Sequence, residues 1–357
     1  MTPTYDKIHF KFKLNGNSYD IEDLKEVAYS LVKEGAPYEK VMGDFLMDWL
    51  DTKDHINVRT SGSTGQPKLM KVSKQAMVNS AIATGNYFNM EPGQKALLCL
   101  PTHYIAGKMM LVRAMVLGLE LDFVDPSSQP VFDYGQVYDF SAMIPLQLKN
   151  TVDYIYNIKT LIIGGASIAQ PLEDAIQGLD TKIYATYGMT ETVSHVAVKA
   201  MNGEHKMKYF TVFPEVTISQ DDRGCLIIDA PKVASERLVT NDVVKLHSDT
   251  EFELIGRLDN SINSGGVKLF PEQIEAKLAS KIKERFIIAS KPDETLGEKL
   301  ILVLEGETNT IDKTVFEGLE KFEIPKEIYA TPKFKETATG KIQRKGTLKL
   351  LGKDIVK

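Results

Sequence analysis

Cysteines and long apolar segments are both scarce in this chain. Its 357 residues include two cysteines, Cys99 and Cys225, so a disulfide framework is excluded. Each lies in an apolar run, KALLCLP or GCLIIDAP, which predicts a buried strand and a free thiol in a reducing compartment. No run approaches the roughly 20 apolar residues of a membrane span, and the N-terminus has no signal-peptide core. We therefore expect no membrane insertion and a cytoplasmic location.

A large excess of charge of one sign is also missing. The 43 Lys and Arg residues stand against 48 Asp and Glu residues, and the net charge of −5 argues against a nucleic-acid binder. Internal repeats and low-complexity tracts are absent from the sequence. With 43% hydrophobic and 25% charged residues, the chain is expected to be a globular small-molecule protein. Association with further copies of the same chain, as a homo-oligomer, stays possible.

The middle of the chain has the pattern of an α/β protein. Short apolar runs, KALLCLP, LELDFVD, TLIIGG and KIYATYG, alternate with segments of helical periodicity or turn residues. A helix is expected to open at Pro171, and residues 242–257 predict an antiparallel hairpin around SDTE. Beyond Gly256 the pattern is that of a small α+β unit, with a helix opening at Pro271. We expect a large α/β domain over residues 1–256 and a small one over residues 257–357.

The segment TSGSTGQPK carries groups that can surround a polyphosphate. Backbone N–H groups, hydroxyls and one cation are the donors that such a ligand needs. The Walker signature is not met, because Pro67 precedes the lysine and Leu69 follows it. Taken alone, the segment could equally be a flexible connection. The candidate phosphate-binding residues are Thr60, Ser61, Gly62, Ser63, Thr64, Gly65 and Lys68.

With four later segments, this loop resembles the signature of the acyl-CoA synthetase, adenylation-domain and luciferase superfamily. Those segments are YGMTET (187–192), TND (240–242), GRLDNSINSGGVKLFPEQIE (256–275) and TGKIQRK (339–345). The resemblance implies a large N-terminal α/β domain, truncated at its start, and a small mobile α+β C-terminal domain. It implies an enzyme that uses ATP, Mg²⁺ and coenzyme A to activate a carboxylic acid.

The resemblance also assigns catalytic roles. Joining a carboxylate to the α-phosphate of ATP brings anions together, so cations and fixed donors must offset their charge. Glu191 matches the metal ligand, Thr190 offers a hydroxyl to the α-phosphate, and Lys341 matches the lysine that holds the reacting groups together. Outside the motif, the same lysine would be an ordinary solvated side chain.

Five residues match the nucleotide contacts of the superfamily: Gly164, Gly165, Tyr187, Asp242 and Arg257. The glycines are expected to let a base or acyl group approach the backbone, Tyr187 to stack on adenine, and Asp242 to accept the ribose hydroxyls. Arg257 is assigned to the ribose or phosphate side. The structural alternatives are a buried turn, a turn-forming aspartate and a surface ion pair.

Domain movement is implied by a further set of matches. Asp259 occupies the hinge position, and Gly265 and Gly266 match the loop that lines the tunnel for coenzyme A. A hinge would let one site run adenylation and then thiol transfer. The alternative for Asp259 is a capped turn.

Within the superfamily, the chain is similar to the o-succinylbenzoate:CoA ligases of menaquinone biosynthesis, through LPTHYIAGKMMLVRAM (100–115) and GMTETVSHVAV (188–198). That acid carries a second carboxylate, so a polar donor is expected in an apolar pocket. His103 would gate the acid site, and His195, Lys108 and Arg113 are the candidate acid-binding residues. A buried structural histidine and surface charges are the alternatives.

Three other functions stay open. The chain could be an aryl or medium-chain acid:CoA ligase, or an adenylating enzyme that loads a carrier-protein thiol. A protein of another class, a catalytically idle nucleotide binder, is disfavoured by the presence of both Glu191 and Lys341.

Overall fold

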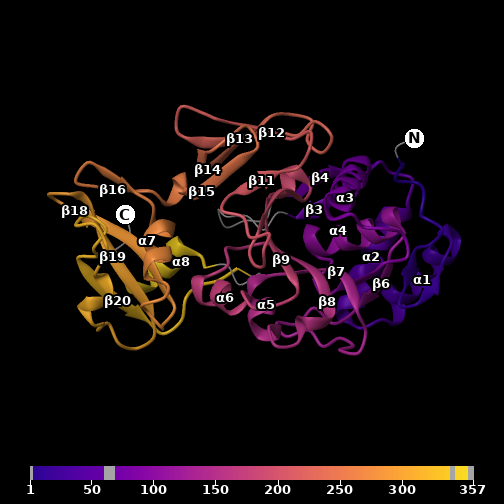
Figure 1. Cartoon of the computed structure of the whole chain (residues 1–357), viewed down its shortest axis with the longest axis horizontal. Coiled ribbons are helices and arrows are strands. Elements are labelled where there is room, and N and C mark those ends of the chain that lie inside the picture. Colours follow the sequence, from indigo (N-terminus) through magenta and orange to yellow (C-terminus); the bar gives the residue numbers. More distant parts are fainter. Residues whose placement is uncertain (1–2, 60–68, 338–341, 353–357) are drawn as a thin grey trace. The chain divides into compact units, whose positions relative to one another are not determined.

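The computed structural model describes residues 3–59, 69–337 and 342–352, which form two compact units (Figure 1). The first unit consists of Met1–Ile168, Ala175–Thr217 and Ile228–Leu238. The second consists of Ala169–Asp174, Ile218–Ile227 and Val239–Lys357. The domain boundary after residue 256 stays a prediction.

A largely parallel sheet forms the centre of the first unit. Five strands pair in the order β9-β8-β7-β5-β6, all parallel, and β1 joins β6 in parallel at one edge. At the other edge, β10 pairs antiparallel with β9, and β11 with β10. The four predicted apolar runs are β5, β6, β8 and β9, and most of their apolar side chains are buried, as expected for a sheet covered on both faces. The strands are β1 Lys13–Leu14, β2 Asn17–Ser18, β5 Lys95–Leu98, β6 Glu120–Phe123, β7 Tyr138–Met143, β8 Ile158–Ile163, β9 Lys182–Gly188, β10 His195–Ala200 and β11 Phe210–Val212.

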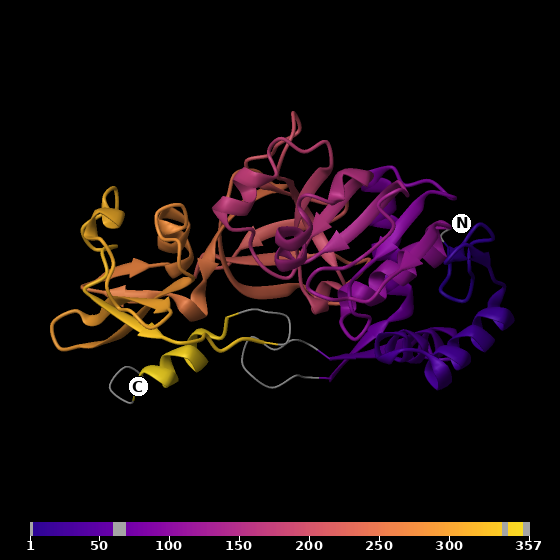
Figure 2. The same ribbon diagram turned by 90° about the horizontal axis from the view of Figure 1, so that it is seen from below.

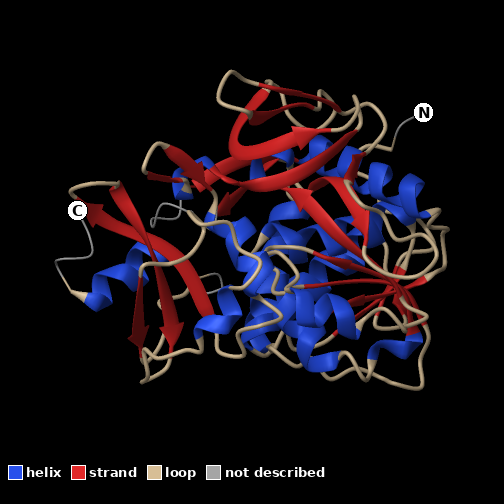
Figure 3. Cartoon of the chain, turned by 60° about the vertical axis from the view of Figure 1, so that its left-hand side comes forward, coloured by secondary structure: helices blue, strands red, loops and turns tan. Residues whose placement is uncertain are grey.

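Helices gather around the strands of the first unit (Figure 3). Helix α4 is buried over most of its length, because it lies against β5 and β6 and is covered by α3. Helices α1 and α2 form a hairpin that precedes the two-stranded ribbon of β3 and β4. The bounds are α1 Ile21–Glu34, α2 Pro37–Leu50, α3 Lys74–Phe88, α4 Ile105–Leu117, α5 Pro145–Thr151, β3 His55–Arg59 and β4 Leu69–Ser73, with a 3-10 turn at Ile155–Asn157.

The helix predicted at Pro171 is present but short. Helix α6 spans Gln170–Ala175 and has Pro171 in its first turn, where the missing N–H costs nothing. Ile176, which the periodicity placed in the same helix, is fully buried beyond its end. Burial therefore explains the apolar pattern of this segment better than a continuing helix does.

The second unit contains the predicted hairpin and a small sheet. Strands β14 and β15 pair antiparallel across the turn at residues 247–250, which confirms the hairpin. In the small sheet, β17, β16, β19 and β18 pair in that order, and β20 joins β19. The elements are β12 Thr217–Gln220, β13 Cys225–Asp229, β14 Leu238–Leu246, β15 Glu251–Arg257, β16 Ile262–Ser264, β17 Val267–Leu269, α7 Pro271–Leu278, β18 Phe286–Asp293, β19 Gly297–Glu305, β20 Glu327–Thr331 and α8 Arg344–Leu348, with 3-10 turns at Leu258–Asn260, Lys313–Phe316 and Lys349–Leu351.

Both faces of the small sheet are covered, as the alternation of side chains along its strands requires. Ile288, Leu302 and Leu304 pack with α7 on one face. Ile301 and Val303 belong to the cluster on the other face, which α8 and the following 3-10 turn cover (Figure 2). Two-sided burial explains why RFIIAS and KLILVLEG read as nearly continuous apolar runs.

Both cysteines are buried and free, as predicted. Burial raises the pKa of the Cys99 thiol to about 12. Among the described residues, no helix has the length and apolar character needed to cross a membrane.

Candidate active site

Gly164 and Gly165 follow β8 directly, at the carboxyl edge of the parallel sheet. This is the edge at which open α/β sheets bind ligands. Gly165 has φ +85°, a conformation that favours glycine. A Cβ atom on Gly164 would lie 2.8 Å from the Thr186 hydroxyl, which donates to the Ile163 carbonyl at 3.0 Å. A side chain is therefore disfavoured by a close contact at Gly164 and by the backbone conformation at Gly165, which leaves the backbone partly open at this edge.

Tyr187 lies near the end of the neighbouring strand, β9. The residue is 8% exposed, and its ring packs edge-on to Phe210, with 6.1 Å between ring centroids. The phenol is thus set in the core of the first unit, with a small part of its surface exposed. Stacking on adenine stays a prediction for this residue.

The residues between β9 and β10 form a short loop that carries the two candidate catalytic side chains. Thr190, Glu191 and Thr192 make one 3-10 turn. Glu191 is exposed, Thr190 is half-buried and Thr192 is fully buried. No Lys, Arg or His of the described segments forms an ion pair with Glu191, so its carboxylate is available to a ligand.

A buried polar cluster lies behind this loop. Arg113, from α4, is 2% exposed, and its Nη2 donates to Ser194 Oγ at 2.8 Å. Ser194 Oγ also lies 3.3 Å from Nδ1 of His195, and Thr84 Oγ1 lies 3.5 Å from Nε2 of the same ring. The structure therefore brings Arg113 and His195, two of the three predicted acid-binding residues, into one cluster.

Burial controls the charge of this cluster. It lowers the pKa of Arg113 to about 9. Burial, with the nearby Arg113 cation, holds the pKa of His195 well below its usual range, so the imidazole is neutral at pH 7. No Asp or Glu among the described residues pairs with Arg113, and its Nε has no hydrogen-bond partner there. A buried guanidinium without a carboxylate is costly unless an anion joins it.

Lys108 lies on another side of α4 and is not part of the cluster. Its Nζ sits 4.6 Å from the centre of the Phe45 ring of α2. Burial lowers its pKa to about 8, although Asp48 and Asp44 act in the opposite direction. Lys108 and Arg113 are five residues apart, about 140° around the helix, which explains why they diverge.

His103 precedes α4 and is exposed. Its ring packs edge-on to Tyr104, 5.3 Å away. It follows Thr102, whose hydroxyl is buried without a partner among the described residues. The buried-histidine alternative is therefore wrong for His103, while its proposed gating role stays a prediction.

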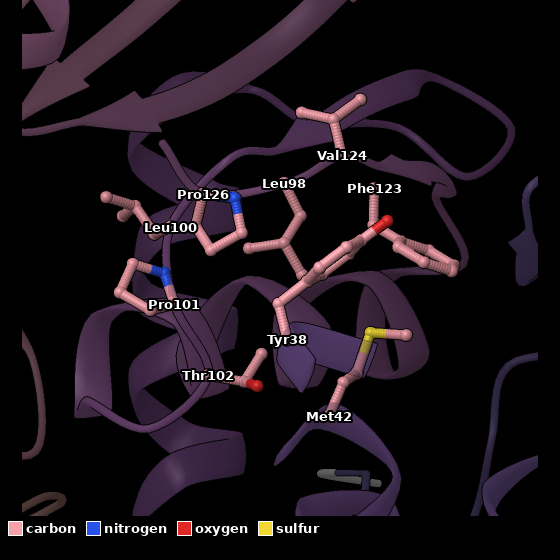
Figure 4. Close-up of a pocket in the computed structure, with 9 residues that line it drawn as sticks. All are labelled: Tyr38, Met42, Leu98, Leu100, Pro101, Thr102, Phe123, Val124 and Pro126. Atoms are coloured by element: carbon pink, nitrogen blue, oxygen red, sulfur yellow. The ribbon is translucent and has the colours of Figure 1, made fainter. Parts of the chain in front are cut away.

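A narrow cavity of about 10 Å³ adjoins this segment at the carboxyl ends of β5 and β6 (Figure 4). Its walls are mostly apolar and come from α2 and the ends of the two strands. The volume is close to that of one water molecule, too small for an organic acid. The lining residues are Tyr38, Met42, Leu98, Leu100, Pro101, Thr102, Phe123, Val124 and Pro126.

A wider groove of about 390 Å³ lies at the amino ends of β7, β8 and β9. Phe88 and Phe140 form part of its apolar lining, and Lys159 and Lys182 are among its charged residues. None of the predicted site residues lines it. The predicted site therefore lies elsewhere than this groove.

The second unit holds a network of ionised side chains at the end of β15. Arg257 donates from Nη1 to Asp242 at 3.0 Å and from Nη2 to Asp259 at 2.8 Å. Asn241 Nδ2 donates to Asp259 at 3.3 Å. The guanidinium thus holds the predicted ribose-binding carboxylate and the predicted hinge carboxylate in one arrangement. The ion-pair alternative for Arg257 is confirmed, and a nucleotide contact stays a prediction.

Gly265 and Gly266 form the two-residue turn between β16 and β17. Their φ angles of +57° and +82° match the hairpin turn in which both central residues need positive φ. The remaining predicted residues, Thr60 to Gly65, Lys68 and Lys341, lie outside the described residues.

Three polar residues of the first-unit site were not predicted: Thr84, Thr192 and Ser194. Thr192 and Ser194 lie inside segments that carried the resemblance, so their position beside Glu191 was a usable signal. Thr84 comes from α3, more than one hundred residues earlier, and no local pattern marks it.

Similarity to known proteins agrees with this geometry. Residues 58–224 match the AMP-binding enzyme family. A solved acyl-CoA synthetase (AMP-forming)/AMP-acid ligase II-like protein from Dyadobacter fermentans DSM 18053 is 36% identical, covers 92% of this chain and 98% of its own, and superposes with a TM-score of 0.60. The chain belongs to the AMP-binding enzyme family. This confirms the resemblance to the acyl-CoA synthetase superfamily that the sequence motifs indicated.

More distant relatives of this chain are named for one acid, o-succinylbenzoate. The 2-succinylbenzoate–CoA ligase of Lactococcus lactis is 26% identical over 84% of this chain and 71% of its own. The o-succinylbenzoate CoA synthetase of Bacillus subtilis shares the fold in two solved structures. One is in complex with ATP and magnesium ion, with 18% identity, coverage of 82% and 69%, and a TM-score of 0.68. The other is in complex with the acyl-adenylate intermediate, with 17% identity, coverage of 88% and 75%, and a TM-score of 0.70.

Proposed function

We propose that this family member is an ATP-dependent acid:CoA ligase that converts o-succinylbenzoate to o-succinylbenzoyl-CoA in menaquinone biosynthesis. The choice of substrate rests on the buried Arg113 cation beside neutral His195, with no acidic partner among the described residues. A dicarboxylic acid supplies the missing anion with its second carboxylate, while the first one reacts. The relatives named for this acid support the same choice.

The reaction would proceed in two steps. A carboxylate oxygen of the acid attacks the α-phosphorus of ATP, the bond from that phosphorus to the oxygen bridging to the β-phosphate breaks, and acyl-adenylate and pyrophosphate form. The thiolate of coenzyme A then attacks the acyl carbon, and AMP leaves with the original carboxylate oxygen. Thr190 and Lys341 are the proposed donors to the reacting groups in the first step.

A divalent cation fits the exposed Glu191. Among the described residues no group of three His, Cys, Asp or Glu side chains could hold a metal by itself. Mg²⁺ in ATP-dependent sites commonly takes one or two carboxylates plus phosphate oxygens and water, so one free carboxylate suffices. When bound, it would neutralise phosphate charge. Glu191 would hold it next to Thr190.

We also assign residues to the nucleotide and to the thiol. We assign the phosphates to Thr60–Gly65 and Lys68, the base to Gly164, Gly165 and Tyr187, and the ribose to Asp242 with Arg257. Asp259 is the proposed hinge, and the Gly265–Gly266 turn is assigned to the coenzyme A side. His103 is proposed to gate the acid, and Lys108 is retained as a third, more remote acid-binding candidate. Free thiols fit a cytoplasmic location.

The test is pyrophosphate release from purified protein with Mg-ATP, with and without coenzyme A, across o-succinylbenzoate, benzoate, coumarate and medium-chain acids. We expect release selective for o-succinylbenzoate and a CoA thioester when the thiol is present. K341A should abolish release yet still transfer a supplied acyl-adenylate to coenzyme A. Pyrophosphate release with a different acid would contradict the proposed substrate. No release with any of the acids would contradict the proposed function.

A further inference from the structure

The loop between β9 and β10 contains a strained residue next to the candidate catalytic pair. Val193 has φ +65° and ψ −55°, and Ser194 N donates to Thr192 O at 2.7 Å. This is a γ-turn of the rare, positive-φ form. For a β-branched residue, positive φ is a true outlier, because its Cβ is crowded by the backbone. Such conformations persist only where their surroundings impose them.

The loop has little freedom at either end. A Cβ atom on Gly188, the last residue of β9, would lie 2.3 Å from the Ser194 carbonyl oxygen, so the two ends touch. The Val193 side chain is 2% exposed and belongs to the main hydrophobic core. Ser194 is held from α4 by the hydrogen bond from Arg113. The strain is thus imposed by close packing on both sides.

Thr192 closes the loop from the inside. Its fully buried hydroxyl accepts from Met189 N at 3.0 Å and lies 2.7 Å from Ser194 O, to which it donates. One side chain thereby joins the residue before Thr190 to the residue after Val193. Removing the hydroxyl would take this side-chain partner away from the half-buried Met189 N–H and the half-buried Ser194 carbonyl.

Glu191 occupies the middle of the segment that this hydroxyl spans. Its neighbours are tied at both sides, since Val193 N also donates to Thr190 O at 2.9 Å. The carboxylate itself points to no cation of the described residues and is exposed. The backbone of the loop therefore sets where the Glu191 side chain starts, and no partner side chain among the described residues holds it.

We propose that Thr192 is a positioning residue, whose hydroxyl holds the Val193 γ-turn closed and so aims Thr190 and Glu191 at the magnesium-bound nucleotide. The proposal rests on the proposed function, which supplies the nucleotide. Groups that orient a metal ligand typically change metal affinity about 10-fold or more when they are removed. The loss should therefore concern the magnesium-dependent part of nucleotide binding.

The test is calorimetric titration of the full chain with ATP, once with Mg²⁺ and once with EDTA, without acid so that no turnover occurs. In the wild type, Mg²⁺ should strengthen ATP binding. T192V keeps the shape of the side chain and loses the hydroxyl. In this variant the factor by which Mg²⁺ strengthens ATP binding should be about 10-fold smaller than in the wild type, while the ATP affinity in EDTA is unchanged. T192S, which keeps the hydroxyl, should retain the gain. A T192V protein with the wild-type gain would overturn the proposal.

A second variant separates positioning from plain destabilisation. Glycine adopts positive φ without strain, so V193G should keep the magnesium gain, and T192V/V193G should recover what T192V lost. If T192V alone does not fold, a folded double variant with the gain intact supports the proposal. The proposal would be overturned if T192V and T192V/V193G lost the magnesium gain equally, or if neither variant folded. If the wild-type protein bound no ATP, the proposed function itself would be contradicted.

Discussion

Arg113 and His195 show how burial sets the charge of individual side chains in the first unit. The imidazole is kept neutral because solvent is excluded and a guanidinium lies nearby. The guanidinium donates a hydrogen bond from Nη2 to one uncharged hydroxyl, Ser194 Oγ. Such a pair favours an anionic ligand over water, because the ligand replaces lost solvation with charge.

The buried imidazole has a consequence for stability against pH. Its folded pKa is depressed, so below about pH 6.5 the unfolded chain binds a proton that the folded chain does not. Stability is then lost as pH falls. Between pH 7 and 5.5, the wild type should lose about 1 kcal/mol more unfolding free energy than H195Q does. Urea denaturation at both pH values measures this difference.

Exposed His205 offers the matched control. H205Q should follow the wild-type pH dependence, since this ring lies at the surface. Identical pH slopes for wild type and H195Q would show that His195 is not held neutral in the fold.

At the residue level, sequence motifs pointed to the candidate reactive groups but not to the residues that support them. Glu191, Arg113 and His195 were predicted, and the structure places all three at or behind one loop. Thr84 was not predictable, because its contact with His195 depends on how α3 packs. The Val193 turn was not predictable either, since a β-branched residue normally indicates extended backbone.

Helix α4 is positioned by a close approach of its first turn to the preceding loop. A Cβ atom on Gly107 would lie 2.4 Å from the Pro101 carbonyl oxygen and 2.8 Å from Thr102 N. Both are backbone atoms and cannot move aside without shifting the loop that carries His103. The helix that presents Arg113 is thereby locked to the end of β5.

G107A should therefore destabilise the protein, although alanine favours helix by about 1 kcal/mol. Overpacking of this kind costs about 1–3 kcal/mol, and the shifted His103 loop should also lower acid-dependent pyrophosphate release. Thermal unfolding and the release assay measure the two effects. A106G, at an exposed site of the same helix, is the control and should lower stability without lowering activity. Wild-type stability in G107A would contradict the close packing.

Elements with continuous apolar runs were the most predictable ones. β5, β6, β8 and β9 were all expected, because buried strands have no polar face. Their order was not, since crossovers between parallel strands leave no local trace. The helical hairpin of α1 and α2 was not predicted either, and α6 is shorter than its periodicity indicated.

At the scale of the whole molecule, the two units hold separate parts of the proposed chemistry. The first unit carries the strand ends, the Thr190–Glu191 loop and the buried Arg113–His195 cluster. The second carries the Asp242–Arg257–Asp259 network and the double-glycine turn. The change of composition after Gly256 predicted a boundary. The compact units depend on contacts between segments that are distant in the sequence. These contacts place most of β14 and all of β15 in the same unit as the C-terminal residues.

The fate of one oxygen atom tests the central claim, that the acid is activated as an acyl-adenylate. The protein would be incubated with Mg-ATP, coenzyme A and o-succinylbenzoate labelled with ¹⁸O in the aliphatic carboxylate, and the nucleotide product analysed by mass spectrometry. The account predicts AMP that carries one ¹⁸O atom, together with unlabelled pyrophosphate. ADP with labelled inorganic phosphate would contradict it, because that pattern requires attack at the terminal phosphorus of ATP.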